Sequence, residues 1–277
     1  MRKLPFIATV AAVVLAVAAP WIASIGRAPV SAAAAGAGDG PATAVREQRA
    51  AVPSRADSWA DRYPEFFAQQ PDLDAANQQL TALVESGSRD TLDVLTAIVE
   101  TRSLPRRWRN YAVQHLGHVA RLGMDGDVLS PLRSYATPDA EPEVRDVAVY
   151  TIALIASTSG AGVAWRVAAD RAVAGALAAT DPLVIESGIR GSVLLGDSAN
   201  LPVIARWAGD ATQALFVRLA AVDAVGLLGS RAVVPFLISV LRDAPDADDA
   251  HPIHVASLRA ISRLSSQTTP TSGAPKS

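Results

Sequence analysis

Cysteine is absent from the 277-residue chain, and this absence removes several kinds of chemistry at once. Disulfides, thiolate metal sites, cysteine nucleophiles and covalent haem attachment all require a thiol. A bacterial lipoprotein is excluded for the same reason, because its lipid is carried by an N-terminal cysteine. Any function must therefore rest on other side chains.

Lysine is almost as scarce, since the only two are Lys3 and Lys276. No lysine between them can serve a phosphate-binding loop, form a Schiff base or act as a general base. Aromatic residues make up 5% of the chain whereas half of all residues are hydrophobic, which favours closely packed helices of Ala, Val, Leu and Ile. A net charge of −2 argues against a nucleic-acid partner.

The first 26 residues are typical of a targeting segment. Arg2 and Lys3 precede the uncharged run Leu4–Gly26, whose 23 residues can span a bilayer of about 30 Å as a helix. Basic residues on the cytoplasmic side predict export of the chain that follows. We expect residues 1–26 to be a signal peptide or a retained membrane anchor. Possible small-residue cleavage sites follow, for example Val30-Ser31-Ala32, and the distance of this good site from the apolar run favours the anchor.

Residues 27–56 predict a flexible linker, because Ala, Gly, Pro and Ser dominate there and no apolar period appears. A Gly-Ala-Gly-Asp-Gly run lies within it, but no strand precedes the run and no Lys-Ser/Thr follows, as a phosphate loop would require. We expect a folded helical domain over residues 57–268 and a disordered tail over 269–277. The aromatic cluster in Asp57–Gln70 suits either a cap on the first repeat or a ligand patch.

The most regular part of the chain is a pair of amphipathic helices over residues 216–243. The first, FVRLAAVDAVGLLG, has apolar residues at helical spacing and ends near Gly229. The second, SRAVVPFLISVLRD, carries Pro235 in its first turn, where no intrahelical N–H is needed. One such hairpin cannot bury its own apolar surface, so it needs copies on either side.

Copies of the first helix recur with aligned starts at residues 109, 145, 185, 218 and 254, which gives spacings of 36, 40, 33 and 36. The second helix recurs at Leu201–Asp210 and Val128–Ala136, each with an early proline, and as the longer Val163–Ala179. A period of 33–40 residues with two helices per unit predicts an all-α fold, an α-solenoid of stacked antiparallel helix pairs.

The segment RLAAVDAVGLLGSRAVVPFLISVLRD resembles a HEAT repeat, specifically the short bacterial type also found in phycobilin lyases. The resemblance is clearest over about Asp181–Ser265 and weakens back to about Asp72. It implies an α-solenoid with a concave face for protein partners. It transfers no catalytic residue, because the matching positions pack neighbouring repeats together. The tetratricopeptide alternative fits less well, since its Trp–Gly–Tyr pattern is missing.

Two irregular segments are candidates for partner contact. Leu104–Arg109 places three arginines around a tryptophan, a combination that interfaces favour; the candidate residues are Arg106, Arg107, Trp108 and Arg109. The same pattern also suits a helix start with the indole in the core and the arginines in solvent. The expected loop Asp243–His254 supplies the acidic candidates Asp246, Asp248 and Asp249 but lacks the turn Gly and terminal Glu of an EF-hand.

No motif in the sequence assembles a catalytic or metal site. His115 and His118 are three residues apart, whereas a HExxH zinc site needs four-residue spacing and a Glu. We therefore expect no cofactor and no metal, and predict a non-catalytic scaffold that binds protein partners. Export would place it in the cell envelope, held to the membrane through residues 4–26 if these are not cleaved. The alternatives are a HEAT-like lyase or enzyme subunit that attaches a prosthetic group, and a structural assembly factor of an envelope complex.

Overall fold

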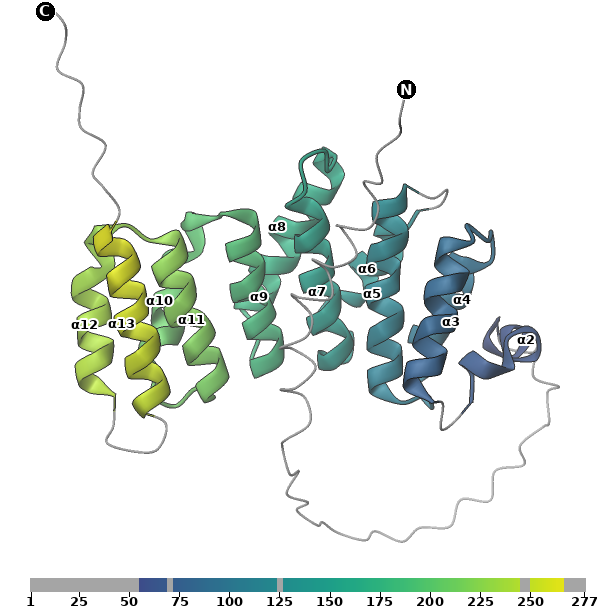
Figure 1. Ribbon diagram of the computed structural model, residues 1–277, viewed down its shortest axis with the longest axis horizontal. Coiled ribbons are helices and arrows are strands. Elements are labelled where there is room, and N and C mark those ends of the chain that lie inside the picture. The colour runs from purple at the N-terminus through teal and green to yellow at the C-terminus, as the bar shows by residue number, and fades with distance from the viewer. Residues whose placement is uncertain (1–54, 69–71, 124–126, 245–249, 267–277) are drawn as a thin grey trace, which may run out of the picture. The chain divides into compact units, whose positions relative to one another are not determined.

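The computed structural model describes residues 55–68, 72–123, 127–244 and 250–266, and within these ranges all regular structure is helical (Figure 1). This confirms the all-α prediction. The predicted targeting segment 1–26, nearly all of the linker 27–56 and the tail 269–277 lie outside the described residues. The first helix starts at Arg55, just inside the predicted linker.

The helices follow one another with short connections. In chain order they are α2 (Arg55–Arg62), the 3-10 turn η1 (Pro64–Phe66), α3 (Leu73–Glu85), α4 (Thr91–Glu100), α5 (Arg106–Leu122), α6 (Leu129–Tyr135), α7 (Pro142–Ala156), α8 (Val163–Leu177), α9 (Pro182–Leu195), η2 (Ser198–Asn200), α10 (Leu201–Gly209), α11 (Leu215–Leu228), η3 (Arg231–Val233), α12 (Val234–Asp243) and α13 (Ala250–Ser266). None of the described helices is both long enough and apolar enough to cross a bilayer.

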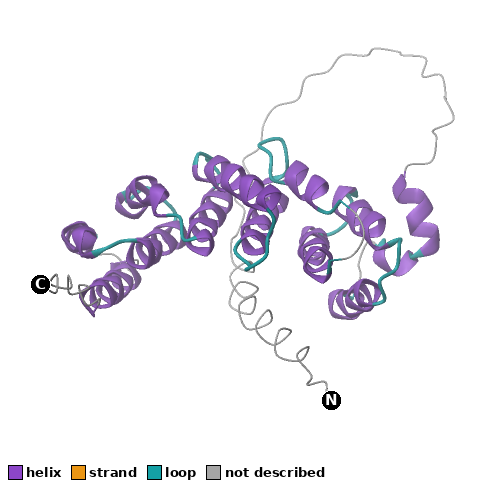
Figure 2. Ribbon diagram, turned by 90° about the horizontal axis from the view of Figure 1, so that it is seen from above, coloured by secondary structure: helices purple, strands orange, loops and turns teal. Residues whose placement is uncertain are grey.

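The helices pack in two layers whose order follows the chain. The odd-numbered helices form the first layer, in which α3 contacts α5, α5 contacts α7, and so on through α9 and α11 to α13. The even-numbered helices α4, α6, α8, α10 and α12 form the second layer, and each packs on the odd-numbered helix that follows it (Figures 1 and 2). Contacts within the second layer are sparse, and α6 touches α8 only slightly.

Local sequence fixes where several helices begin and end. Asp72 and Asp181 cap α3 and α9, since each carboxylate accepts hydrogen bonds from two backbone N–H groups of the first turn. Proline occupies the first turns of α7, α9, α10 and α12. The predicted hairpin over residues 216–243 is present as α11 and α12, with Pro235 in the first turn as expected. A single 3-10 turn, η3, precedes the second helix.

Glycine allows the closest approaches between helices. A Cβ added to Gly117 of α5 would lie 2.5 Å from Cγ2 of Thr151 on α7, and one added to Gly226 of α11 would lie 2.6 Å from Cβ of Ala260 on α13. Real side chains do not tolerate such contacts, so these crossings depend on the missing methyl group. The sequence repeat contains these positions, because Gly117 and Gly226 each lie eight residues after an aligned start.

Arginines satisfy carbonyl groups at helix C-termini, which have no partner within their own helix. Arg109 Nε donates to the carbonyl of Val99 in the last turn of α4, and Arg145 Nη2 donates to that of Gly175 near the end of α8. Arg231 likewise donates to the carbonyls of Leu264 and Ser265 at the end of α13. The cationic side chains also complement the negative end of each helix dipole.

An aromatic cluster joins the N-terminal segment to the first helices. The rings of Trp59, Tyr63, Phe66 and Trp108 contact one another in sequence, with neighbouring centroids 5.8–6.2 Å apart. The indole N–H of Trp108 donates to the carbonyl of Phe66 at 2.8 Å, and α2 packs on α4. This packing accounts for the aromatic residues that suggested either a cap or a ligand patch.

Candidate functional site

The structure separates the four predicted partner-binding residues at the start of α5 into two groups. Trp108 is fully buried and Arg109 is 5% exposed, whereas Arg106 and Arg107 are exposed. Of the two interpretations of this segment, the structure agrees with a helix start that has the Trp108 indole in the core, but it buries Arg109, which that interpretation placed in solvent. Their side chains complete the core between the aromatic cluster and α4, so partner contact stays a prediction for Arg106 and Arg107.

Arg109 is held by an ion pair inside the fold. Its Nη1 lies 2.7 Å from Oε2 of Glu141, and Arg102 approaches the other oxygen of the same carboxylate at 3.3 Å. The hydrogen bond from Arg109 is the largest cause that lowers the pKa of Glu141. Because Glu141 immediately precedes α7, this pair links the start of α5 to the start of the next odd-numbered helix.

Arg106 and Arg107 already have intramolecular partners, although both are exposed. Arg106 Nη1 lies 2.6 Å from Oε1 of Glu143. Arg107 Nε donates to the hydroxyl of Tyr111, and its guanidinium lies 5.6 Å from the centroid of the same ring. A partner would have to compete with these contacts, which are weak at an exposed position.

The three acidic candidates Asp246, Asp248 and Asp249 lie outside the described residues. The structure does shorten the expected loop, because α13 begins at Ala250. His251 and His254 are therefore helical residues and not loop residues, which corrects the expectation of a loop over 243–254. Pro252 suits the first turn of this helix, a signal that the sequence contained.

His115 and His118 form a stacked pair, with ring centroids 6.4 Å apart. Nε2 of His115 lies 2.9 Å from Oδ1 of Asn77, and burial lowers the pKa of His115 to about 4. The imidazole of His115 is therefore neutral near pH 7, and the side-chain amide of Asn77 holds it in place. Among the described residues, no group of three or more metal-ligating side chains comes together.

A second buried titratable group lies between α7 and α9. Asp146 is 4% exposed and accepts a hydrogen bond from the hydroxyl of Ser187, while burial raises its pKa to about 7. Glu186 raises the pKa further, whereas the Ser187 hydrogen bond and Arg190 lower it. One carboxyl and one hydroxyl, without a base for the serine, do not form a hydrolytic site.

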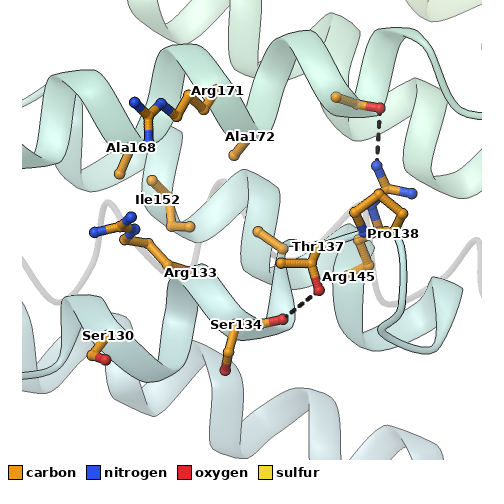
Figure 3. Close-up of a pocket in the computed structure, with 12 residues that line it drawn as sticks. Ser130, Arg133, Ser134, Thr137, Pro138, Arg145, Ile152, Ala168, Arg171 and Ala172 are labelled. Carbon is orange, nitrogen blue, oxygen red and sulfur yellow. Dashed lines mark hydrogen bonds between the residues drawn. The ribbon is translucent and has the colours of Figure 1, made fainter.

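A cavity lies between α6, α7 and α8 (Figure 3). Its volume is about 530 Å³. Three arginines line it, one from each helix: Arg133 of α6, Arg145 of α7 and Arg171 of α8. The remaining lining residues are hydroxyl-bearing or apolar, and none is acidic; they are Ser130, Ser134, Ala136, Thr137, Pro138, Ile152, Ala168, Ala172 and Gly175. We call this cavity the arginine pocket.

The three arginines of this pocket differ in burial. Arg145 is 8% exposed, with Nη2 bound to the carbonyl of Gly175 and Nε lacking any hydrogen-bond partner. Burial lowers the pKa of Arg145, and Asp181 acts in the opposite direction. Arg133 and Arg171 are exposed, and neither guanidinium makes a hydrogen bond or an ion pair with any described residue. Figure 3 shows their guanidinium groups on the same side of the pocket, reaching it from α6 and α8.

Sequence reasoning missed the arginine pocket, although one signal for it was present. In the sequence, Arg145 stands out only as the first residue of one copy of the repeated helix. Neither Arg133 nor Arg171 has an acidic residue three or four positions away, so neither can form the usual ion pair along its own helix. Unpaired arginines on two companion helices would have marked this surface as cationic.

Comparisons with protein-family models, with curated proteins and with solved structures gave no match to this chain.

Proposed function

We propose that this chain is a HEAT-like α-solenoid that acts as a non-catalytic scaffold for protein partners. The observation that supports this most is the order of the helix contacts, in which α3, α5, α7, α9, α11 and α13 each pack on the next. A chain whose units contact only their neighbours in sequence is organised as a repeat array. Such arrays use their extended surface for binding.

The mechanism of the proposed scaffold is geometric. The close crossings at Gly117 and Gly226 and the arginine links to helix ends hold adjacent units in fixed register. Side chains on the outer surfaces are then free to select a partner. Arg106 and Arg107 are the exposed candidates at the start of α5. Their charge favours an acidic patch on the partner.

The proposed location is the cell envelope, and its basis is the sequence of residues 1–26 alone. With this segment as an anchor or signal, the repeat domain would act outside the cytoplasm. Membrane attachment would then depend on whether the segment is cleaved. Mass determination of the mature chain from its native host distinguishes the two cases.

Proximity labelling with the full-length chain in its native host tests the scaffold function. We expect one or a few envelope proteins to be labelled, and the purified partner to bind the purified chain directly. The charge-reversed variant Arg106→Glu/Arg107→Glu should bind more weakly than wild type. The matched variant Arg242→Glu/Arg259→Glu, with exposed positions on α12 and α13, should bind like wild type.

Two results would count against the scaffold. Failure to label any partner, combined with turnover of a substrate, would indicate an enzyme. A coloured or fluorescent adduct on a carrier protein, formed on co-expression with a chromophore, would favour the lyase alternative. Labelling confined to the subunits of one envelope complex during its formation would identify the scaffold as an assembly factor.

A further inference from the structure

We propose that the arginine pocket binds a small organic oxyanion, that is, a phosphate or carboxylate group attached to an apolar body. This inference concerns the cavity between α6, α7 and α8 and does not depend on the protein-binding role proposed above. It follows from the charge of the pocket, from an unpaired buried donor in its wall, and from its size and apolar lining.

The charge of the arginine pocket is not balanced by its own lining. Arg133, Arg145 and Arg171 contribute three guanidinium groups, and no lining residue is Asp or Glu. Asp139, Asp146 and Asp170 are close in sequence to lining residues but do not line the pocket, and Asp181 acts on Arg145 from the start of α9. Guanidinium groups bind phosphate and carboxylate oxygens in paired, charge-assisted hydrogen bonds, so an oxyanion is the complementary ligand.

Arg145 is a buried cation among the residues that line the pocket. The residue is more than nine-tenths buried, and its Nε donor has no acceptor. A buried donor without an acceptor is unfavourable, because it has lost its hydrogen bonds to water and has formed no other bond in their place. The hydrogen bond to the Gly175 carbonyl fixes the guanidinium in place, so that an anion entering the pocket meets an oriented cation.

Arg133 and Arg171 provide the adjustable part of the site. Both are exposed, and their guanidinium groups have no ion pair or hydrogen bond with a described residue, so they can turn toward a ligand without breaking such a bond. They approach from different helices, α6 and α8, and lie on the same side of the pocket (Figure 3). The hydroxyl of Ser130 also lines the pocket and can add a neutral donor.

The size of the pocket points to more than a free inorganic ion. At about 530 Å³ it falls within the range of cavities that hold small organic molecules, roughly 300–1,000 Å³. Half of its lining is apolar, through Ala136, Pro138, Ile152, Ala168, Ala172 and Gly175. A ligand with an anionic head and an apolar body would use both parts of the lining, because the apolar surface gains from burial as well.

Isothermal titration of the purified full-length chain with phenyl phosphate, inorganic phosphate and phenol tests this inference. We expect phenyl phosphate to bind more tightly than inorganic phosphate, and phenol not to bind, since the head group supplies the charge and the ring fills the apolar part. Binding should weaken as salt is raised. Benzoate in the same titration separates a phosphate preference from a general oxyanion site.

Two double variants that remove the same charge make the test specific. Arg133→Ala/Arg171→Ala should weaken phenyl phosphate binding by about tenfold or more, the loss expected for charge-assisted hydrogen bonds. Arg242→Ala/Arg259→Ala removes two exposed arginines outside the pocket and should leave the affinity unchanged. Circular dichroism checks that both variants are folded. Both variants replace exposed residues and leave the buried Arg145 unchanged.

Several outcomes would overturn the proposal. No binding of phenyl phosphate or benzoate to the wild type would do so, as would equal weakening in the two double variants. Binding of a poly-glutamate peptide or of phosphatidic acid vesicles, without binding of the small anions, would assign the arginines to a protein or membrane surface instead. Each of these results leaves the scaffold proposal to be judged by its own labelling experiment.

Discussion

At the scale of single residues, two buried groups with shifted pKa values respond to pH in opposite directions. The folded state raises the pKa of Asp146 to about 7, whereas it lowers that of His115 to about 4. Burial is the largest cause in both cases, because a low-polarity interior disfavours whichever form is charged. The wild-type stability curve between pH 4 and pH 7 is therefore the sum of two opposing effects.

The variant Asp146→Asn isolates the first effect. Between about pH 4 and pH 7 the folded state keeps a proton on Asp146 that the unfolded state has released, so the free energy of unfolding falls as pH rises. Asparagine does not titrate, so the variant does not lose stability in this way as pH rises. We expect the variant to be more stable than wild type at pH 8 by up to a few kcal/mol, with the advantage shrinking toward pH 4.

Urea unfolding at a series of pH values measures this difference. Asp170→Asn, which changes an exposed acid of α8, serves as the control and should show no such pH-dependent gain. A stability difference between Asp146→Asn and wild type that stays constant from pH 5 to pH 8 would contradict the raised pKa. The contribution of His115 cancels in the comparison, because it is present in both proteins and acts between about pH 6.5 and 4.

At the scale of helices, the crossing of α11 and α13 depends on a single missing methyl group. Gly226→Ala would place Cβ 2.6 Å from Cβ of Ala260 and 2.9 Å from its Cα, so one of the two helices has to shift. We expect a loss of about 1–3 kcal/mol, the usual cost of overpacking. The gain in helix propensity of almost 1 kcal/mol offsets only part of it.

Thermal unfolding of Gly226→Ala beside Gly209→Ala checks this prediction. A Cβ at Gly209 of α10 would meet only Cε2 of Phe236 at 3.8 Å, an ordinary contact. That control should therefore be neutral or slightly stabilising. Equal melting temperatures for the two variants would mean that the α11–α13 crossing adjusts without cost.

The helices were predictable where the spacing of apolar residues agrees with the residues that start or end a helix. The expected pair over residues 216–243 matches α11 and α12 because apolar spacing, Gly229 and Pro235 all indicate the same boundaries. The start of α13 was missed, since the acidic residues before it suggested a loop through His254. Boundaries of this kind depend on weak local preferences, which packing against α11 and α12 overrides.

The candidate site was much less predictable than the helices. The sequence suited either partner contact or a buried Trp108 with exposed arginines, and it did not predict that Glu141 holds Arg109 in the interior. The arginine pocket was missed because Arg133, Arg145 and Arg171 are distant in sequence and meet only when α6, α7 and α8 pack. The repeat period reflects the residues that pack neighbouring units together. It carries no information about the residues on the exposed surfaces.

At the scale of the whole repeat domain, the neighbour-only contacts predict that damage stays local. Leu80 of α3 is fully buried, and α3 contacts α5 but none of the helices near the C-terminus. Leu80→Ala should cost about 2–5 kcal/mol locally. In a repeat array this loss need not reach distant units, because stability is a sum of unit and interface terms.

Hydrogen exchange read by mass spectrometry distinguishes local from global loss. We expect Leu80→Ala to increase exchange in α3 and α5 and to leave α11 and α13 protected. Leu264→Ala, at the fully buried end of α13, should give the reverse pattern. Uniform loss of protection across all helices in either variant would show one cooperative domain and would weaken the solenoid proposal.

The slight contact between α6 and α8 has a mechanical consequence. Along the second layer these two helices are joined mainly through α7, on which both of them pack. An anion bound by Arg133 of α6 and by Arg171 of α8 would add a second, reversible link between the two helices. Binding of the anion would then restrict the motion of α6 relative to α8 and make the array more rigid at this position.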